Sequence, residues 1–134
     1  MSDYTVTWYG YSFVAKFQNG ILKNHWQDMI GALPESDKRE LARRLRNVTD
    51  TNGWDGELGH AIHVGGGKFD VDISPDVLKR GSDFARSVIA HELAHCLVNF
   101  QAADDLERER LADAKAAEWG FRSYGAAAYI RHSK

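Results

Sequence analysis

The chain has 134 residues, of which 43% are hydrophobic and 27% are charged. These values are ordinary for a globular protein and exclude a disordered, collagen-like or fibrous chain, and the length predicts a single domain over residues 1–134. The formal charge of −2 gives no field that would attract nucleic acid or an anionic membrane over the whole surface, and the apolar runs are too short to span a bilayer.

The first third of the chain predicts a hairpin followed by a helix. Residues 4–17 are rich in Tyr, Thr, Val, Trp and Phe around Gly10, which predicts one or two strands. Apolar residues at helical spacing then predict a helix over residues 21–33, which Pro34 ends.

A second helix is expected from Ser36 or Asp37 to about Val48, because Leu41, Leu45 and Val48 would share one face. Basic side chains between residues 38 and 46 cover its other sides. We interpret them as a solvated charged face, with nucleic-acid binding as the alternative.

The middle of the chain predicts a second hairpin. Residues 61–64 are typical of a short strand, and three glycines at positions 65–67 are typical of a hairpin turn. They lack the Lys-Ser/Thr ending of a phosphate-binding loop. Apolar and polar residues alternate over residues 69–73, which predicts a half-buried strand that Pro75 ends.

The last third predicts helices. Residues 82–100 are apolar on more than one side, as expected of a buried central helix. Asp104 and Glu107 resemble a capping box that opens a further helix to about Trp119, where Gly120 stops it, and a short helix is expected over residues 124–131.

The most informative motif is His91-Glu92-Leu93-Ala94-His95 within the predicted central helix. Residues four apart lie on one helix face, so both imidazoles can reach one ion, and neutral histidine is a good zinc ligand. Glu92 would project beside the metal, where it can hold a water without being a ligand. The alternative is a pair of histidines packed in a buried helix.

A catalytic zinc usually has three protein ligands, so a third is expected from the next helix. Glu109 and Asp113 share a helix face, and we favour Glu109 as the ligand with Asp113 as the acceptor for the free ring N–H of a bound histidine. Asp113, Glu107 and His132 are the alternative ligands. Small residues between positions 112 and 117 would let the two helices approach closely.

Cys96 is the single cysteine, so no intramolecular disulfide can form and any metal must be held by histidines and carboxylates. Residues 1–4 lack the basic flank and the apolar stretch of a secretory signal. We therefore expect a reducing, cytoplasmic location.

The HExxH motif together with Glu109-Arg110-Leu111-Ala112-Asp113 resembles the small zincin metallopeptidases of the gluzincin type. The Glu-x-x-Ala-Asp form is similar to that of the ImmA/IrrE-type peptidases, and the resemblance covers roughly residues 60–121. The longer metzincin pattern is absent, because Val98 and Gln101 occupy its glycine and histidine places.

This resemblance implies an α+β zincin fold, with a small, mostly antiparallel sheet packed on the HExxH helix and a second ligand-bearing helix. It implies a Zn²⁺ cofactor held by His91, His95 and Glu109, with Glu92 as the general base of peptide-bond hydrolysis. It also implies that the strand before the active-site helix pairs with an extended peptide substrate. The residues expected in that strand are Phe69, Asp70, Val71, Asp72 and Ile73.

A second donor to the developing oxyanion is expected from one of His60, His63, Tyr124, Tyr129 and His132. The expected partner is a peptide or protein, with neither a membrane nor nucleic acid, and the oligomeric state is left open. The competing function is a non-catalytic zinc-binding interaction module on the same fold.

Overall fold

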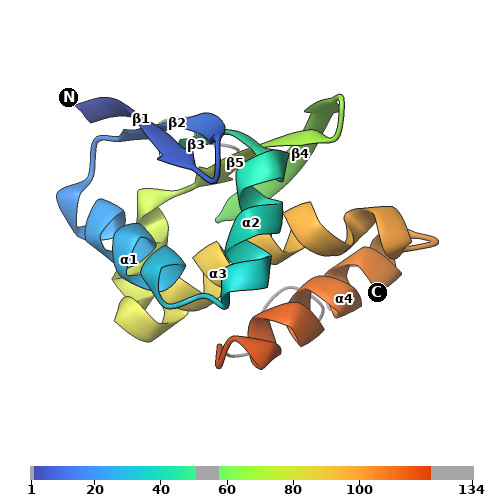
Figure 1. Cartoon of the computed structure of the whole chain (residues 1–134). Helices are drawn as coiled ribbons and strands as arrows, with labels where there is room; N and C mark the ends of the chain where they lie inside the picture. The colour runs from blue at the N-terminus through green and yellow to red at the C-terminus, as the bar shows by residue number, and fades with distance from the viewer. Residues whose placement is uncertain (1, 51–57, 122–134) are drawn as a thin grey trace.

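The computed structural model describes residues 2–50 and 58–121. Within these ranges the chain forms five strands, four α-helices and two short 3-10 helices (Figure 1). In chain order they are β1 (Ser2–Trp8), β2 (Tyr11–Phe17), α1 (Gly20–Gly31), α2 (Glu35–Arg44), β3 (Leu45–Thr49), β4 (Gly59–Gly65), β5 (Lys68–Ile73), η1 (Pro75–Arg80), α3 (Ser82–Val98), η2 (Asn99–Gln101) and α4 (Asp105–Glu118). The short helix expected over residues 124–131 lies outside the described residues.

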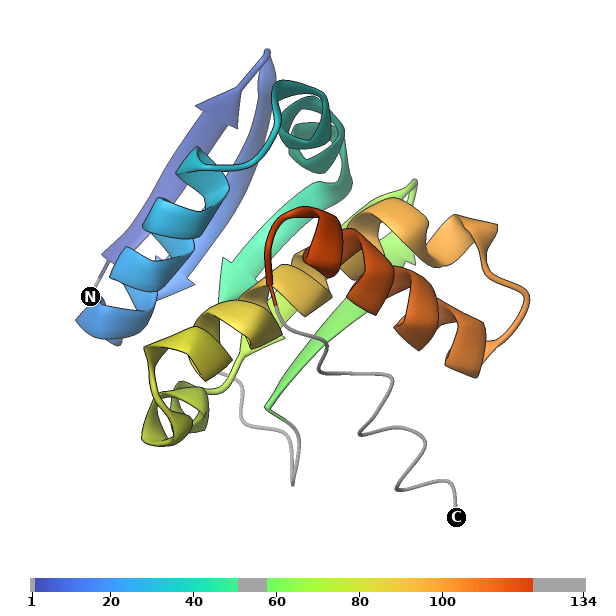
Figure 2. The same cartoon turned by 90° about the horizontal axis from the view of Figure 1, so that it is seen from below.

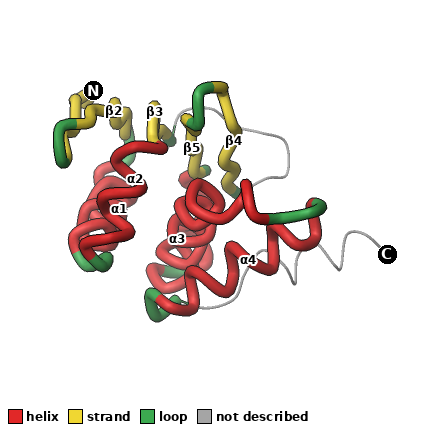
Figure 3. The backbone as a smooth tube through the Cα atoms, turned by 45° about the vertical axis from the view of Figure 1, so that its right-hand side comes forward, coloured by secondary structure: helices red, strands yellow, loops and turns green. Residues whose placement is uncertain are grey.

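The strands form one sheet in the order β1-β2-β3-β5-β4, and the helices lie beneath it (Figure 3). The β1–β2 and β4–β5 pairs are antiparallel, whereas β3 is parallel to both β2 and β5. The α+β class is therefore confirmed, but the sheet is mixed rather than mostly antiparallel. Both expected hairpins are present, and glycines 65–67 turn the second of them with positive φ angles.

The mixed sheet results from a strand that the sequence analysis assigned to a helix. The spacing of Leu41, Leu45 and Val48 fits a helix, but α2 ends at Arg44 and the chain is extended from Leu45 onward. A register shift between Leu45 and Asn47 inserts an extra residue, so Leu45 and Val48 both face the core from a strand. A spacing of three residues between buried positions normally indicates a helix, but here it occurs in a strand that contains a bulge.

The expectation that residues 69–73 pair with a peptide is wrong. These residues belong to β5, which is paired with β3 on one side and β4 on the other, so both of its edges are already used. Among the described strands, β4 is the edge of the sheet on this side.

The central helix α3 lies between the sheet and α4, and side chains around its whole circumference are buried. Figure 2 shows α3 crossing beneath the strands, with α4 packed on its outer side. Ala94 on α3 and Ala112 on α4 are fully buried in one cluster, which confirms that small residues allow the two helices to approach closely. No helix in the described ranges has both the length and the apolar character needed to cross a membrane.

Candidate metal centre

The two histidines of the HExxH motif project from one face of α3 toward α4. His91 and His95 are buried, with 1% and 6% of their surface exposed, and their Nε2 atoms lie 3.0 Å apart. Their separation by four residues places them one turn apart, as the motif predicts.

Glu109 on α4 completes a group of three residues. Its Oε1 lies 3.0 Å from His91 Nε2, and its Oε2 lies 2.8 Å from His95 Nε2. The potential ligand atoms all lie within 4.8 Å of one another, so His91, His95 and Glu109 could hold a metal ion. Neighbouring ligands of a tetrahedral zinc lie roughly 3.4 Å apart, given bonds of about 2.1 Å, so the spacing of these donors fits that ion.

The outer nitrogens of both imidazoles are held by other side chains. His91 Nδ1 donates to Asp113 Oδ1 at 2.9 Å, and His95 Nδ1 donates to Asn99 Oδ1 at 2.6 Å. A histidine that donates through Nδ1 presents the lone pair of Nε2 to a metal. Asp113 therefore takes the supporting position expected for it, and Asn99 is a supporting residue that the sequence analysis missed.

The result is a buried cluster of electron-pair donors that needs a cation. Two Nε2 lone pairs and one carboxylate converge within about 3 Å, and without a positive charge between them they would repel one another. Although burial alone would lower the pKa of His91, its hydrogen bonds to Asp113 and Glu109 raise that pKa to about 10.

The pKa of Glu109 is shifted in the direction that favours its negatively charged form. Burial acts to raise it, but hydrogen bonds from His91 and His95 lower it to about 2. Glu109 therefore stays ionised, and a metal binding here must displace a proton held between the donors.

Glu107, one of the alternative third ligands, does not lie at this centre. Glu107 is at the exposed start of α4, where its Oε1 accepts from the backbone N–H of Ala103 at 2.6 Å. The N-cap of the same helix is Asp104, which accepts from the Glu107 N–H at 2.8 Å. His132 lies outside the described residues.

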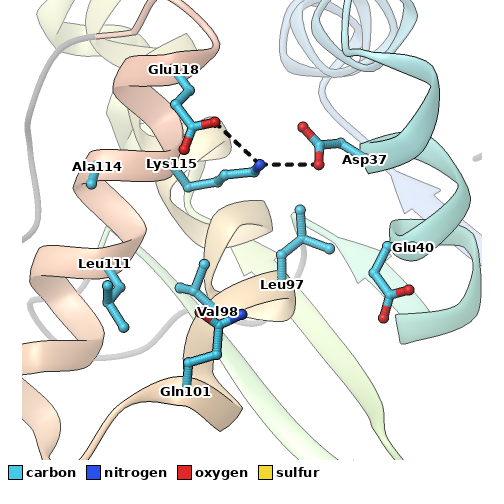
Figure 4. Close-up of a pocket in the computed structure, with 9 residues that line it drawn as sticks. All are labelled: Asp37, Glu40, Leu97, Val98, Gln101, Leu111, Ala114, Lys115 and Glu118. Atoms are coloured by element: carbon cyan, nitrogen blue, oxygen red, sulfur yellow. Dashed lines mark hydrogen bonds and ion pairs between the residues drawn. The ribbon is translucent and has the colours of Figure 1, made fainter.

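Contacts between α2 and α4 hold the ligand-bearing helix in place. Asp37 accepts from Trp119 Nε1 at 2.8 Å and pairs with Lys115 Nζ at 3.1 Å (Figure 4). These contacts border a hollow of about 340 Å³ between α2, α3 and α4. The hollow lies on a different face of α4 from Glu109 and Asp113, so it is not part of the metal centre.

Glu92 is buried, with 4% of its surface exposed, and lies between α3 and the start of β4. Its Cγ would be 3.1 Å from a Cβ at Gly59, which places the carboxylate side chain directly against the edge strand. Its charge contributes to the raised pKa of His91, so the two residues are close enough to interact electrostatically. Glu92 does not belong to the ligand group itself.

The other residues considered for this site have different surroundings. The ring of His63 packs against Phe69 and Phe100, and His60 lies opposite Asp72 in the β4–β5 pair. Neither histidine belongs to the ligand group found among the described residues, and Tyr124 and Tyr129 lie outside the described residues. Cys96 is a buried residue of α3, and burial raises the pKa of its thiol. It does not belong to the group of His91, His95 and Glu109.

Comparisons with protein-family models, with curated proteins and with solved structures find no match for this chain. The conclusion about the site therefore depends on its geometry. A triad of His91, His95 and Glu109 on helices α3 and α4 is consistent with a zincin-like site of the form HxxxH followed by a downstream glutamate.

Proposed function

We propose that this chain is a zinc-dependent peptidase. The observation that supports the proposal best is the convergence of His91 Nε2, His95 Nε2 and the Glu109 carboxylate, each histidine being oriented by its own acceptor. Three protein ligands of this kind leave the fourth position of a tetrahedral zinc open, as in catalytic rather than structural sites. Zinc bound there would polarise a carbonyl group and lower the pKa of water to about 7.

Glu92 is the group that moves the proton. It is adjacent to His91 in the chain and buried beside the ligand group. As general base it accepts a proton from the water that attacks the peptide carbonyl. It then delivers that proton to the nitrogen of the leaving amine as the C–N bond breaks.

An extended peptide would be bound along the edge of β4, in place of the β5 residues expected at first. Residues 61–64 follow Gly59, the residue against which Glu92 packs, so this edge runs past the metal centre. Main-chain hydrogen bonds to a sheet edge bind peptides without regard to their sequence.

The basic side chains between residues 38 and 46 form ion pairs, which favours a peptide or protein substrate over nucleic acid. Glu40 pairs with Arg43 at 3.0 Å and with Arg44 at 2.8 Å, and Asp70 pairs with Arg46 at 2.6 Å. Two carboxylates thus offset part of the charge of these three arginines, which reduces their attraction for phosphates.

Metal analysis of the purified protein tests the proposal. We expect about one zinc per chain and hydrolysis of an unstructured protein such as casein, abolished by a chelator and restored by zinc. His95→Ala should lose most of the zinc, whereas the control His63→Ala, which alters a histidine outside the ligand group, should retain it. Full zinc occupancy in His95→Ala would contradict the site. Zinc binding without any hydrolysis would favour the competing function, a non-catalytic zinc-binding interaction module.

Gly59→Ala gives a prediction about the position of Glu92. A Cβ at residue 59 would lie 3.1 Å from both Glu92 Cγ and Val88 Cγ1 and 3.3 Å from the Asp72 carbonyl oxygen, so a neighbour must shift. The shift required is a few tenths of an ångström. Because a displacement of about 1 Å can cost about 10²-fold in rate, we expect this smaller shift to lower hydrolysis by about 10-fold or less, with the zinc content unchanged.

The matched control is Gly31→Ala, because a Cβ at residue 31 meets no atom within 4 Å. Peptide hydrolysis and bound zinc would be measured side by side for both variants. Equal rates for Gly59→Ala and Gly31→Ala would show that Glu92 is not held by this contact.

A further inference from the structure

Phe100 is an exposed aromatic residue whose ring has three close contacts with other side chains. It follows α3 in η2, and 56% of its surface is exposed. Its ring is 5.1 Å from that of His63 and 5.6 Å from that of Phe69, and the Arg44 guanidinium lies 5.2 Å from its centre. Single exposed apolar residues are common, but most are not held by three ring and cation contacts.

Strand β4 contacts the surroundings of the metal centre at its start and Phe100 farther along. This strand begins at Gly59 beside Val88 and Glu92, and four residues later His63 contacts Phe100. The strand and α3 therefore run in the same direction. In the sequence, His91 lies beside the first of these contacts and His95 lies between the first and the second.

The distance from the metal centre to Phe100 can be expressed in residues of a bound peptide. Seven residues separate the midpoint of the two histidines from Phe100, which is about 10 Å along a helix. An extended peptide covers that distance in about three residues.

We propose that Phe100 forms the floor of a side-chain subsite that takes an aliphatic or aromatic residue about three positions from the cleaved bond. The inference rests on the proposed peptidase function and on a peptide bound along β4. Burial against a fixed aromatic ring favours an apolar side chain, because no additional ordering of Phe100 is required. Lysine and arginine are disfavoured, because the Arg44 guanidinium already occupies the neighbourhood of the ring and would repel a second cation.

The alternation of strand side chains separates this subsite from Ile62, an exposed apolar residue of β4. Ile62 directly precedes His63 in the strand, so it points to the opposite face of the sheet. A peptide residue on that face would meet Ile62 and would not contact Phe100.

The test uses the zinc-loaded full chain and fluorescent peptides of alanine and glycine, in which one phenylalanine, lysine or alanine is moved along the sequence. With wild type, we expect kcat/KM to rise about 10-fold for phenylalanine over alanine at a single position near three residues from the cleaved bond, and to fall for lysine there. Phe100→Ala should reduce the preference for phenylalanine over alanine at that position to within about twofold. Phe100→Leu should retain much of the preference.

The control variant is Tyr11→Ala, which removes another exposed aromatic side chain. Tyr11 lies on β2, and the Lys68 ammonium group is 5.7 Å from the centre of its ring. It should leave the preference unchanged. Binding of the same peptides to zinc-loaded Glu92→Gln, measured by fluorescence polarisation, gives a readout that does not require hydrolysis. A flat preference in wild type, or a preference that survives in Phe100→Ala, would overturn the subsite even if the protein is a peptidase.

Discussion

Glu92→Gln should lower peptide hydrolysis by a factor on the order of 10² or more while about one zinc per chain remains bound. Glutamine has nearly the same shape as glutamate, so the packing against Gly59 and the orientation of α3 are kept. The amide cannot accept the proton of the attacking water, and only the chemical step is lost. The measurement is a pair of values for each variant, namely the zinc content and the rate on one peptide substrate.

Glu107→Gln is the matched control for this substitution. Glu107 is also an acidic residue that the sequence places near the motif, but it caps the exposed start of α4 and does not face the metal centre. Its substitution should change neither quantity. Equal rates for wild type and Glu92→Gln would show that Glu92 is not the base, and loss of zinc in Glu92→Gln would show that it supports the metal instead.

Both helical pairs of the candidate site could be predicted from sequence, but helical spacing does not determine which acid on α4 contacts the histidines. Residues four apart share a face, which brought His91 to His95 and Glu109 to Asp113 without any knowledge of the fold. The same spacing joins His95 to Asn99, yet Asn99 was missed. An amide at the end of a helix is typical of a surface or cap residue, and nothing in the sequence shows that its carbonyl oxygen turns toward a buried imidazole.

The sheet could be predicted less well, because it depends on contacts between distant segments. Leu45 and Val48 have the spacing of a helix, and only the bulge opposite β5 places both of them in the core as part of a strand. The same pairing with β3 makes β5 an interior strand. The edge strand next to α3 is thus β4, which could not be inferred from the alternation of residues 69–73, since alternation indicates a strand but not its neighbours.

The electrostatics of the centre follow from burial rather than from sequence pattern. Because the pKa of His91 is raised to about 10, this histidine carries a proton at neutral pH in the metal-free protein, and zinc must displace it. Zinc affinity should therefore increase with pH through the neutral range, as fewer protons compete for the donors.

Glu109→Ala should weaken zinc binding more than Asp113→Ala, because the first change removes a bond to the ion and the second removes a hydrogen bond to its ligand. Glu109 supplies both carboxylate oxygens to the histidine pair, at 3.0 and 2.8 Å, whereas Asp113 contacts the outer nitrogen of His91 at 2.9 Å. Loss of such an outer partner typically costs about 10- to 100-fold in affinity or activity, with the metal still able to bind.

The measurement is competition with a zinc-binding dye for Glu109→Ala, Asp113→Ala and the control Glu107→Ala, repeated at two pH values. Asp113→Ala should also flatten the increase of affinity with pH, because the hydrogen bond that raises the pKa of His91 is gone and fewer protons compete with zinc. Glu107→Ala should match wild type at both pH values. Zinc affinity that falls more in Asp113→Ala than in Glu109→Ala would exchange the roles of the two carboxylates, and the pair of histidines would then bind zinc with an aspartate as the third ligand.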